Sequence, residues 1–211
     1  MRSKSKLCQN WKVYVITDPA AGSGDTLVKA VREAILGGAA VIQLRDKEAT
    51  DKDLIKKAEQ LLVLTRSAGI PLIVNDRISV AKKSGADGVH LGQDDASLKE
   101  ARTLLGKRAI IGRSTHSPEQ ALAAQEEGFD YIGVGPVFST PTKPSYAPVG
   151  LELVKFAAAN VKIPFVAIGG IDPMNAAEVK KAGAKTVAVV RAVMASDNPK
   201  ESVESLCRIM S

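Results

Sequence analysis

Short apolar runs rich in Val and Ile recur along the whole chain, and no other feature of the sequence constrains the fold as much. They lack strict alternation of polar and apolar residues, which is typical of strands buried on both faces, as in a parallel sheet covered by helices. The runs are VYVI (13–16), AVIQL (40–44), PLIVN (71–75), GVHLG (88–92), AIIG (109–112), YIGVG (131–135), PFVAIG (164–169) and TVAVV (186–190). We therefore expect eight buried strands.

Amphipathic stretches with helical periodicity lie between these runs, and several of them begin with capping chemistry. The capping residues are Thr50 with Asp53, Ser97 with Glu100, Ser117 before Pro118, and Asp172 before Pro173. The pattern predicts helices over residues 25–36, 52–67, 97–105, 118–127, 151–159, 173–181 and 199–210, with a shorter one over 78–83.

A repeated strand entry indicates a modular fold, because glycine and other small residues precede the even-numbered runs in GGAAVIQL, SGADGVHL, EEGFDYIGV and KAGAKTVAV. Eight βα units that close on themselves make a (β/α)8 TIM barrel, whereas a doubly wound open sheet is the competing layout. The regular succession of eight βα units favours a closed barrel over an open sheet. We expect an α/β fold with a single TIM-barrel domain over residues 1–211, in which residues 1–11 form a basic N-terminal extension.

The composition narrows the class of protein. With 45% apolar and 25% charged residues the chain is typical of a globular protein. Because it contains no long apolar run, we expect neither a membrane span nor a secretion signal. The cytoplasm is therefore the expected location. Cys8 and Cys207 lack the spacing of zinc ligands or of a disulfide framework, so we expect reduced thiols.

The net charge of +6 could indicate a nucleic-acid surface. However, aromatic residues make up only 4% of the chain and no recognition motif for nucleic acids is present, so stacking platforms are missing. The charge favours anionic small molecules as partners, and a solvated basic surface is the alternative.

Polar side chains follow nearly every expected strand at its carboxyl end, where TIM-barrel enzymes place their chemistry. They are Arg45, Asp46, Lys47, Asn75, Asp76, Arg77, His90, Gln93, Asp94, Asp95, Arg113, Ser114, Thr115, His116 and Arg191. The opposite ends of the strands carry no comparable cluster of functional groups. We expect the carboxyl ends to form the working face, although a surface salt bridge or a solvated loop is the alternative for any single charge.

Two pairs among these residues suit a metal-bound diphosphate. Arg45 and Lys47 can supply a guanidinium fork and an ammonium for phosphate oxygens. Asp76 and Asp95 follow adjacent strands and suit a hard divalent cation such as Mg²⁺. Ion bridges to Arg77 and Arg45 are the alternative for the two carboxylates.

The sequence GGI at 169–171, followed by the expected helix start at Asp172, offers backbone amides to a phosphate monoester, unless close packing alone requires the two glycines. The long loop over 139–150 carries Thr140, Thr142 and Lys143 and reads as a lid, with disorder as the alternative. His90 and His116 are candidate general bases, but packed or hydrogen-bonding histidines are commoner.

Six motifs together resemble those of the thiamine phosphate synthase family: QLRDK (43–47), NDR (75–77), HLGQDD (90–95), GRSTH (112–116), GPVFSTPTK (135–143) and AIGGI (167–171). The resemblance implies a TIM-barrel transferase that joins hydroxymethylpyrimidine diphosphate to hydroxyethylthiazole phosphate, or to its carboxylated form. The implied products are thiamine phosphate and pyrophosphate, with CO2 when the thiazole is carboxylated. It also implies Mg²⁺ and a dissociative pyrimidine-cation mechanism.

The resemblance assigns site residues by position. It assigns Gln43, Leu44, Arg45, Asp46, Lys47, Asn75, Ser114 and Lys143 to the pyrimidine diphosphate, and Asp76 and Asp95 to the metal. It assigns Thr140, Pro141, Thr142, Gly170, Val190 and Arg191 to the thiazole phosphate. The residues implied in catalysis are Arg45, Lys47, Lys143 and Ser114. Arg191 departs from the family, which often has a serine there, and a backbone contact would survive the change.

Three rival functions remain open from the sequence. A thiazole tautomerase or related regulatory protein shares the barrel and the phosphate seat but needs no metal-diphosphate cluster. A sugar-phosphate isomerase or lyase would want an acid/base pair and does not explain the QLRDK motif. A non-catalytic protein could capture a phosphorylated ligand. The sequence does not fix the oligomeric state, and a homodimer is compatible with it.

Overall fold

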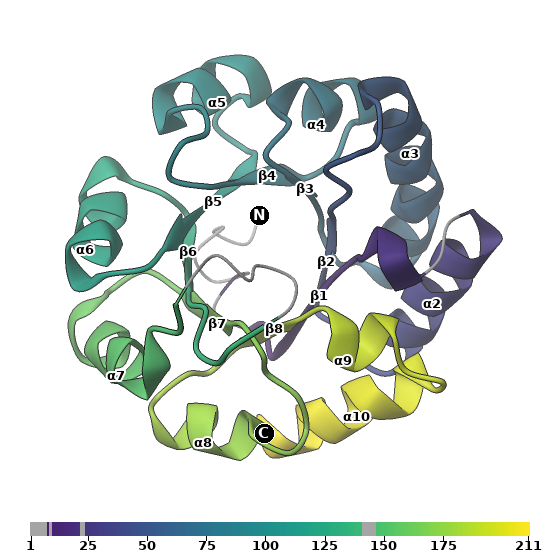
Figure 1. Cartoon of the computed structure of the whole chain (residues 1–211). Helices are drawn as coiled ribbons and strands as arrows, with labels where there is room; N and C mark the ends of the chain where they lie inside the picture. The colour runs from purple at the N-terminus through teal and green to yellow at the C-terminus, as the bar shows by residue number, and fades with distance from the viewer. Residues whose placement is uncertain (1–7, 9, 22–23, 141–146) are drawn as a thin grey trace.

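The computed structural model describes residues 8, 10–21, 24–140 and 147–211. Eight parallel strands close into a barrel in the order of the sequence, so the expected TIM barrel is confirmed and the open sheet is excluded (Figure 1). The strands are β1 (Val13–Ile16), β2 (Val41–Leu44), β3 (Leu72–Asn75), β4 (Gly88–Leu91), β5 (Ile110–Thr115), β6 (Tyr131–Val134), β7 (Phe165–Ile168) and β8 (Val187–Val189). Strand β5 is longer than expected, because Arg113, Ser114 and Thr115 pair with β6 instead of following the strand.

Helices surround the barrel, as Figure 1 shows. They are η1 (Pro19–Ala21), α2 (Asp25–Leu36), α3 (Asp51–Ala68), α4 (Ile78–Ser84), α5 (Leu98–Leu105), α6 (Pro118–Glu127), α7 (Gly150–Asn160), α8 (Ala176–Lys181), α9 (Arg191–Met194) and α10 (Pro199–Ile209). Among the described residues, none of these helices has the length and apolar character needed to cross a membrane.

The expected N-caps are present at Thr50, Ser97 and Ser117, whose side chains each accept a hydrogen bond from an amide three residues later. The fourth prediction is wrong, because α8 begins at Ala176 and not at residue 173. The Asp172 carboxylate accepts a bond from the Met174 amide, and the Asn175 side chain accepts one from the Asp172 amide. These local bonds form a turn that competes with the first helical turn.

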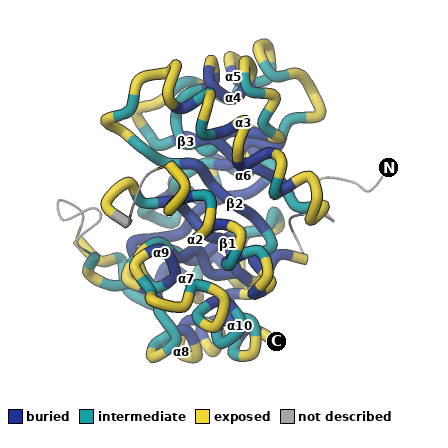
Figure 2. The backbone as a smooth tube through the Cα atoms, turned by 90° about the vertical axis from the view of Figure 1, so that its right-hand side faces the viewer, coloured by how far each residue is buried: buried dark blue, intermediate teal, exposed yellow. Residues whose placement is uncertain are grey.

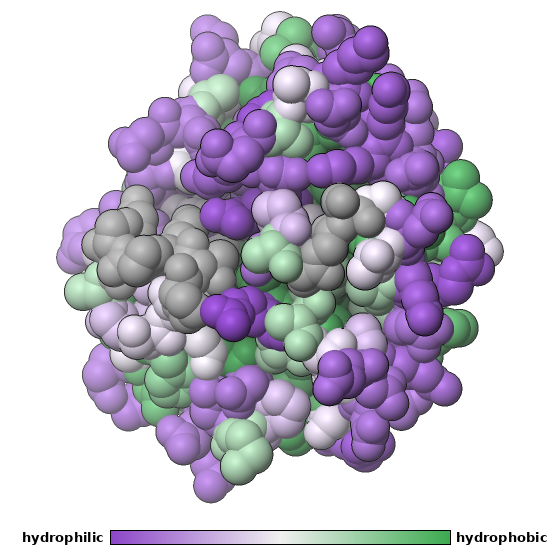
Figure 3. Space-filling view, turned by 45° about the vertical axis from the view of Figure 1, so that its right-hand side comes forward, coloured by the Kyte–Doolittle hydropathy of each residue, from purple (hydrophilic) through white to green (hydrophobic). Residues whose placement is uncertain are grey.

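The barrel has two apolar cores because successive residues of a strand face opposite sides. Residues such as Ile42 and Leu44 point outward and pack against the helices. Val41, Ile73 and Ile110 point inward and fill the barrel. Figure 2 shows the buried strands at the centre and exposed positions along the outer helices. Figure 3 shows that hydrophilic side chains cover much of the outer surface on that face.

Trp11 belongs to the inner core, together with Cys8. Its ring lies edge-on to Tyr14 and Tyr131, with ring centroids 5.7 Å and 5.2 Å away. Both residues fall within the segment expected to form a basic extension, of which residues 1–7 and 9 lie outside the described part. Neither Cys8 nor Cys207 forms a disulfide bond with another described residue.

Two aspartates explain part of the repeated sequence pattern that precedes the even-numbered strands. Asp87 and Asp130 directly precede β4 and β6, and each carboxylate accepts a backbone amide of the preceding strand, from Leu72 at 2.8 Å and from Ile111 at 2.7 Å. Asp130 also pairs with Arg102 at 2.6 Å, and its side chain is only 13% exposed. Each aspartate therefore fixes the entry of one strand relative to its neighbour.

We predict that Asp130→Ala lowers the free energy of unfolding by about 2–4 kcal/mol, because it leaves a buried amide and a partly buried guanidinium without their acceptor. Urea denaturation measures this change. Glu152→Ala is the matched control, since Glu152 pairs with Lys155 on the surface and its loss should cost less than about 1 kcal/mol. Equal effects of the two substitutions would contradict the role given to Asp130.

Candidate active site

A cavity of about 580 Å³ opens at the carboxyl ends of the strands, and all eight strands contribute to its lining. Eight of the residues assigned from the sequence line this cavity: Gln43, Arg45, Asn75, Ser114, Thr140, Gly170, Val190 and Arg191. The alternation along each strand explains the convergence, because Gln43, Asn75 and Ser114 occupy inward-facing positions. The structure therefore brings together residues from six of the eight strands or from the segments that follow them.

Five side chains in the cavity form a continuous hydrogen-bonded series, which we call the polar chain: Gln43, Tyr14, Tyr131, His90 and Ser114. The Gln43 amide nitrogen donates to the Tyr14 hydroxyl at 2.8 Å, and the two tyrosine hydroxyls are 2.9 Å apart. His90 contacts the Tyr131 hydroxyl through Nδ1 at 2.9 Å and the Ser114 hydroxyl through Nε2 at 3.0 Å. Burial raises the pKa of both tyrosines well above the usual range, so their hydroxyls stay neutral.

The sequence analysis did not single out Tyr14 or Tyr131. Both lie in apolar runs and read as core residues, and both are fully buried. The available signal was their inward-facing position, which they share with Gln43 on β2 and Ser114 on β5. His90 was considered as a general base, and the structure places it between two hydroxyls in the polar chain.

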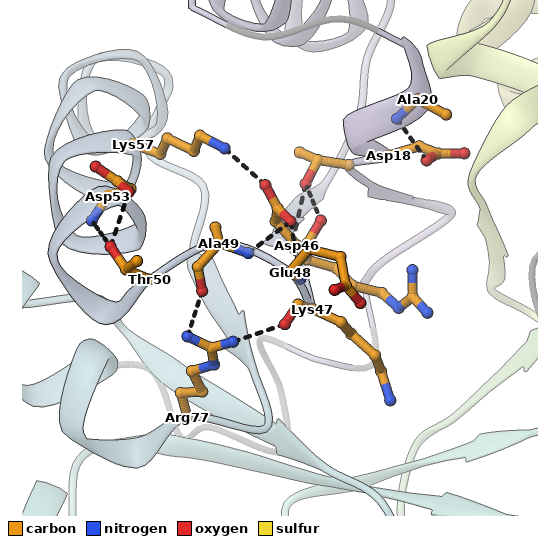
Figure 4. Close-up of polar contacts among 12 residues, drawn as sticks. Asp18, Ala20, Asp46, Lys47, Glu48, Ala49, Thr50, Asp53, Lys57 and Arg77 are labelled. Carbon is orange, nitrogen blue, oxygen red and sulfur yellow. Dashed lines mark hydrogen bonds and ion pairs between the residues drawn. The ribbon is translucent and has the colours of Figure 1, made fainter.

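Several polar contacts hold the segment that follows β2, as Figure 4 shows. Arg77 donates to the backbone carbonyls of Lys47 and Ala49 at 2.8 Å and 2.6 Å, and it pairs with Asp51 at 3.0 Å. Arg77 therefore does not form the ion bridge to Asp76 that was the alternative for that carboxylate. Its side chain instead fixes the backbone from which Lys47 projects.

Three of the described residues assigned to the diphosphate, Leu44, Asp46 and Lys47, do not line the cavity, and neither do Asp76 and Asp95, which were assigned to the metal. Leu44 points outward into the core under the helices. Asp46 accepts bonds from the amides of Glu48 and Ala49 and from the Lys57 ammonium at 2.7 Å (Figure 4). Burial alone would raise the pKa of Asp46, but the bonds from Lys57 and the two amides outweigh it and lower the pKa below the usual value. Asp46 is thus a charged residue that stabilises the conformation of this segment.

Asp76 and Asp95 offer oxygen ligands at the ends of the adjacent strands β3 and β4. Asp76 adopts a positive φ of 61°, an uncommon conformation for a residue other than glycine, and its carboxylate lies 3.7 Å from the Lys47 ammonium. One Asp95 oxygen accepts the Gly92 amide at 2.6 Å, which leaves the other oxygen for a ligand. Gln93 anchors the same loop by donating to the Ser114 carbonyl at 2.6 Å.

These carboxylates fit Mg²⁺ in part. Within the described residues, no group of three or more His, Cys, Asp or Glu side chains is placed to hold a metal ion. A two-carboxylate set is still chemically suitable, because Mg²⁺ is usually bound by one or two carboxylates together with water and substrate phosphates. The donor set therefore suits a cation that arrives with a diphosphate better than a resident metal.

The glycines after β7 combine close packing with free backbone donors. A Cβ atom on Gly170 would lie 2.6 Å from the Ser139 carbonyl oxygen, and one on Gly169 would lie 2.4 Å from Pro136. Packing therefore requires both glycines. The amides of Gly170 and Ile171 donate to no other described residue, and both residues line the cavity near Arg191. These amides can donate hydrogen bonds to the oxygens of a phosphate monoester, although the helix start expected at Asp172 lies at Ala176.

Parts of the expected lid lie outside the described residues. Pro141, Thr142 and Lys143 belong to that segment, whereas Thr140 lines the cavity. His116 also lines the cavity, and its Nδ1 makes a hydrogen bond with the Gly135 carbonyl. This contact is typical of a histidine with a structural role.

Comparisons with known proteins identify the family. Residues 13–193 match the family described as thiamine monophosphate synthase. A thiamine-phosphate synthase of Chloroflexus aurantiacus is 46% identical over 203 residues, covering 96% of this chain and 94% of the relative. A solved thiamine phosphate pyrophosphorylase from Pyrococcus furiosus is 40% identical, has a TM-score of 0.88 and covers 97% of both chains.

A more distant structure shares the fold alone. The (S)-3-O-geranylgeranylglyceryl phosphate synthase of Thermoplasma acidophilum is 18% identical, with a TM-score of 0.72, and covers 98% of this chain and 96% of its own. The match over residues 13–193 and the identity to relatives of similar length are far stronger. On these findings, the chain belongs to the thiamine monophosphate synthase family of transferases.

Proposed function

We propose that this protein condenses 4-amino-2-methyl-5-hydroxymethylpyrimidine diphosphate with hydroxyethylthiazole phosphate, or with its carboxylated form, to give thiamine phosphate and pyrophosphate. Family membership supports the reaction, since the relatives are named for it. The single observation that carries the proposal is one cavity in which Gln43, Arg45, Asn75 and Ser114 converge beside a second set of anion donors at Gly170 and Arg191.

The first step is the loss of the diphosphate. The bond between the pyrimidine methylene carbon and the diphosphate oxygen breaks, and the electron pair leaves with the oxygen. The electron-rich aminopyrimidine spreads the positive charge that remains on the carbon. Arg45 and Lys47 neutralise the negative charge that develops on the leaving group, and they do so without reorganisation because Arg77 holds their segment.

Asp76 and Asp95 would hold Mg²⁺ together with the diphosphate oxygens, and the bound cation would supply additional charge stabilisation for the leaving group. Lys47 lies 3.7 Å from Asp76, so its ammonium and the cation would act on the same end of the diphosphate. Lys143 would add a further positive charge from the segment outside the described residues.

The second step is attack by the thiazole nitrogen. Its lone pair forms the new carbon–nitrogen bond, and the product ring becomes a thiazolium; a carboxylated thiazole also loses CO2. Gly170, Ile171 and the start of α9 would anchor the thiazole phosphate at the carboxyl ends of β7 and β8, whereas Arg45 follows β2. Two anion sites at different strand ends set the direction of approach, so the protein needs no nucleophilic side chain.

Apolar residues close the remaining walls. Ile16, Val166, Ile168 and Ala188 line the cavity between the two anion sites. They provide few positions for ordered water, which would otherwise capture the cation. A lid formed by the segment from Thr140 onward would complete this exclusion. A cytoplasmic location and a homodimer remain predictions.

The direct test incubates the protein with both phosphorylated substrates, with and without Mg²⁺, and measures thiamine phosphate and pyrophosphate. We expect equimolar products with Mg²⁺ and a loss of turnover when EDTA is added. A thiazole tautomerase or a non-catalytic binding protein would release no pyrophosphate from this mixture. Absence of both products under all conditions would refute the proposed reaction.

Asp95→Asn tests the metal assignment. Removing a group that stabilises developing charge typically lowers kcat by about 10²–10³-fold, and we expect a loss of that size. Asp94→Asn is the matched control, because Asp94 is the neighbouring exposed carboxylate of the same loop and is not assigned to the metal. Steady-state kinetics at several Mg²⁺ concentrations measure both variants, and equal activity of the two would remove Asp95 from the mechanism.

Arg191→Ser tests which group holds the thiazole phosphate. We expect the KM for this substrate to change by less than about threefold, because the proposed contact runs through backbone amides whose hydrogen bonds the substitution keeps. If the KM instead rises by more than about tenfold, the guanidinium itself binds the phosphate. The KM for the pyrimidine diphosphate serves as the internal control.

A further inference from the structure

The polar chain carries an inference beyond the two anion sites. Its members are Gln43, Tyr14, Tyr131, His90 and Ser114, each hydrogen-bonded to the next at 2.8–3.0 Å. Its two ends, Gln43 and Ser114, are among the residues that the family resemblance assigns to the pyrimidine diphosphate. The three residues between them have no role in the mechanism described above.

Counting hydrogens fixes the direction of this chain once the Gln43 amide nitrogen is the group that contacts Tyr14. Each tyrosine hydroxyl has one hydrogen and is fully buried, so an unpaired hydrogen would be costly. Tyr14 already accepts from Gln43, so its hydrogen must go to Tyr131. Tyr131 must then donate to Nδ1 of His90.

The donors and acceptors in the rest of the polar chain follow from those in its first half. An Nδ1 atom that accepts requires the proton of a neutral imidazole to be on Nε2, and Nε2 then donates to Ser114. The Ser114 hydrogen has no acceptor among the described residues, and Ser114 lines the cavity. At the other end, the Gln43 amide oxygen is left as an acceptor, and its nitrogen keeps one further hydrogen. Rotating the Gln43 amide by half a turn would reverse every bond in the series.

The site around the chain is built to hold it. A Cβ atom on Gly112 would lie 2.2 Å from the Tyr131 ring and 2.5 Å from His90 Nδ1, so glycine is required at this position. Trp11 packs edge-on against both tyrosine rings. These contacts leave the hydroxyls little freedom to find other partners.

We infer that Tyr14, Tyr131 and His90 are positioning residues that fix Gln43 as an acceptor and Ser114 as a donor, and that this polarity selects an aminopyrimidine over an oxopyrimidine. The inference rests on the proposed function. An aminopyrimidine presents an amino donor and a ring-nitrogen acceptor, which match the two ends of the chain. An oxopyrimidine places an oxygen acceptor where the amino donor was, opposite the Gln43 oxygen.

The first test reads the direction of the chain without any substrate. The sequence contains only two histidines, so ¹⁵N-histidine labelling with His116→Gln as the assignment variant isolates the His90 signals. We expect neutral His90 to carry its proton on Nε2, with Nδ1 unprotonated. Tyr131→Phe should convert this single state into a mixture of the two tautomers. A proton on Nδ1 in the unmodified protein would overturn the inference.

The second test measures specificity. In the unmodified protein, kcat/KM for the aminopyrimidine diphosphate should exceed that for its 4-oxo analogue by at least about 10²-fold, because a site built for one hydrogen-bonding pattern rejects the other. Tyr131→Phe cuts the chain in the middle and frees both ends, so the ratio should fall about tenfold. The KM for the thiazole phosphate should stay unchanged.

Thr115→Val is the matched control for this test. It removes a buried hydroxyl from β5, the strand that carries Ser114. This hydroxyl donates to the Gly133 carbonyl at 2.9 Å and lies outside the polar chain. It should leave the tautomer and the specificity ratio unchanged. An unchanged ratio in Tyr131→Phe would overturn the inference. If Tyr131→Phe does not fold, Tyr14→Phe cuts the chain one bond earlier and gives the same readouts.

The two readouts also separate this inference from the proposed function. If the protein makes no thiamine phosphate, the proposed reaction fails, and the His90 tautomer alone decides whether the chain has the stated direction. If the protein is active but His90 carries the Nδ1 proton, the reaction stands and the inference fails.

Discussion

Burial of both faces of eight parallel strands is the constraint on which the rest of the structure depends. The outward residues pack under the helices and the inward residues fill the barrel, so a polar side chain inside a strand must find partners within the barrel or at its mouth. Gln43 and His90 meet this requirement through buried tyrosines. The same requirement that stabilises the fold therefore builds one wall of the cavity.

The charged groups that follow β2 are supported by contacts with neighbouring side chains. Lys47 is exposed, but its backbone is held by Arg77, and Asp46 beside it is braced by Lys57. Such support allows positive charge to face a leaving diphosphate without the cost of ordering a flexible segment in the transition state. The two aspartates at the ends of β3 and β4 occupy similarly fixed positions, Asp76 with a positive φ and Asp95 bound to its own loop.

The sequence predicted the barrel well because the apolar runs and small-residue entries report directly on two-sided burial. It also predicted eight of the residues that line the cavity, since strand ends gather at one mouth. It missed Tyr14 and Tyr131, because a tyrosine in an apolar run reads as core unless its facing is known. Leu44 and Asp46 lie outside the cavity because adjacent residues point to opposite sides. The helix start expected at Asp172 was wrong because the local hydrogen bonds of Asp172 form a turn, and hydrophobic periodicity does not indicate such bonds.

The central claim is that one end of the barrel binds the diphosphate, its metal and both rings in a fixed arrangement. A crystal structure of the protein with thiamine phosphate, pyrophosphate and Mg²⁺ tests it most directly. The account predicts the pyrimidine between Gln43 and Ser114, pyrophosphate at Arg45, and the cation on Asp76 and Asp95. Pyrophosphate and Mg²⁺ bound elsewhere, with the cavity residues free of ligand, would contradict it.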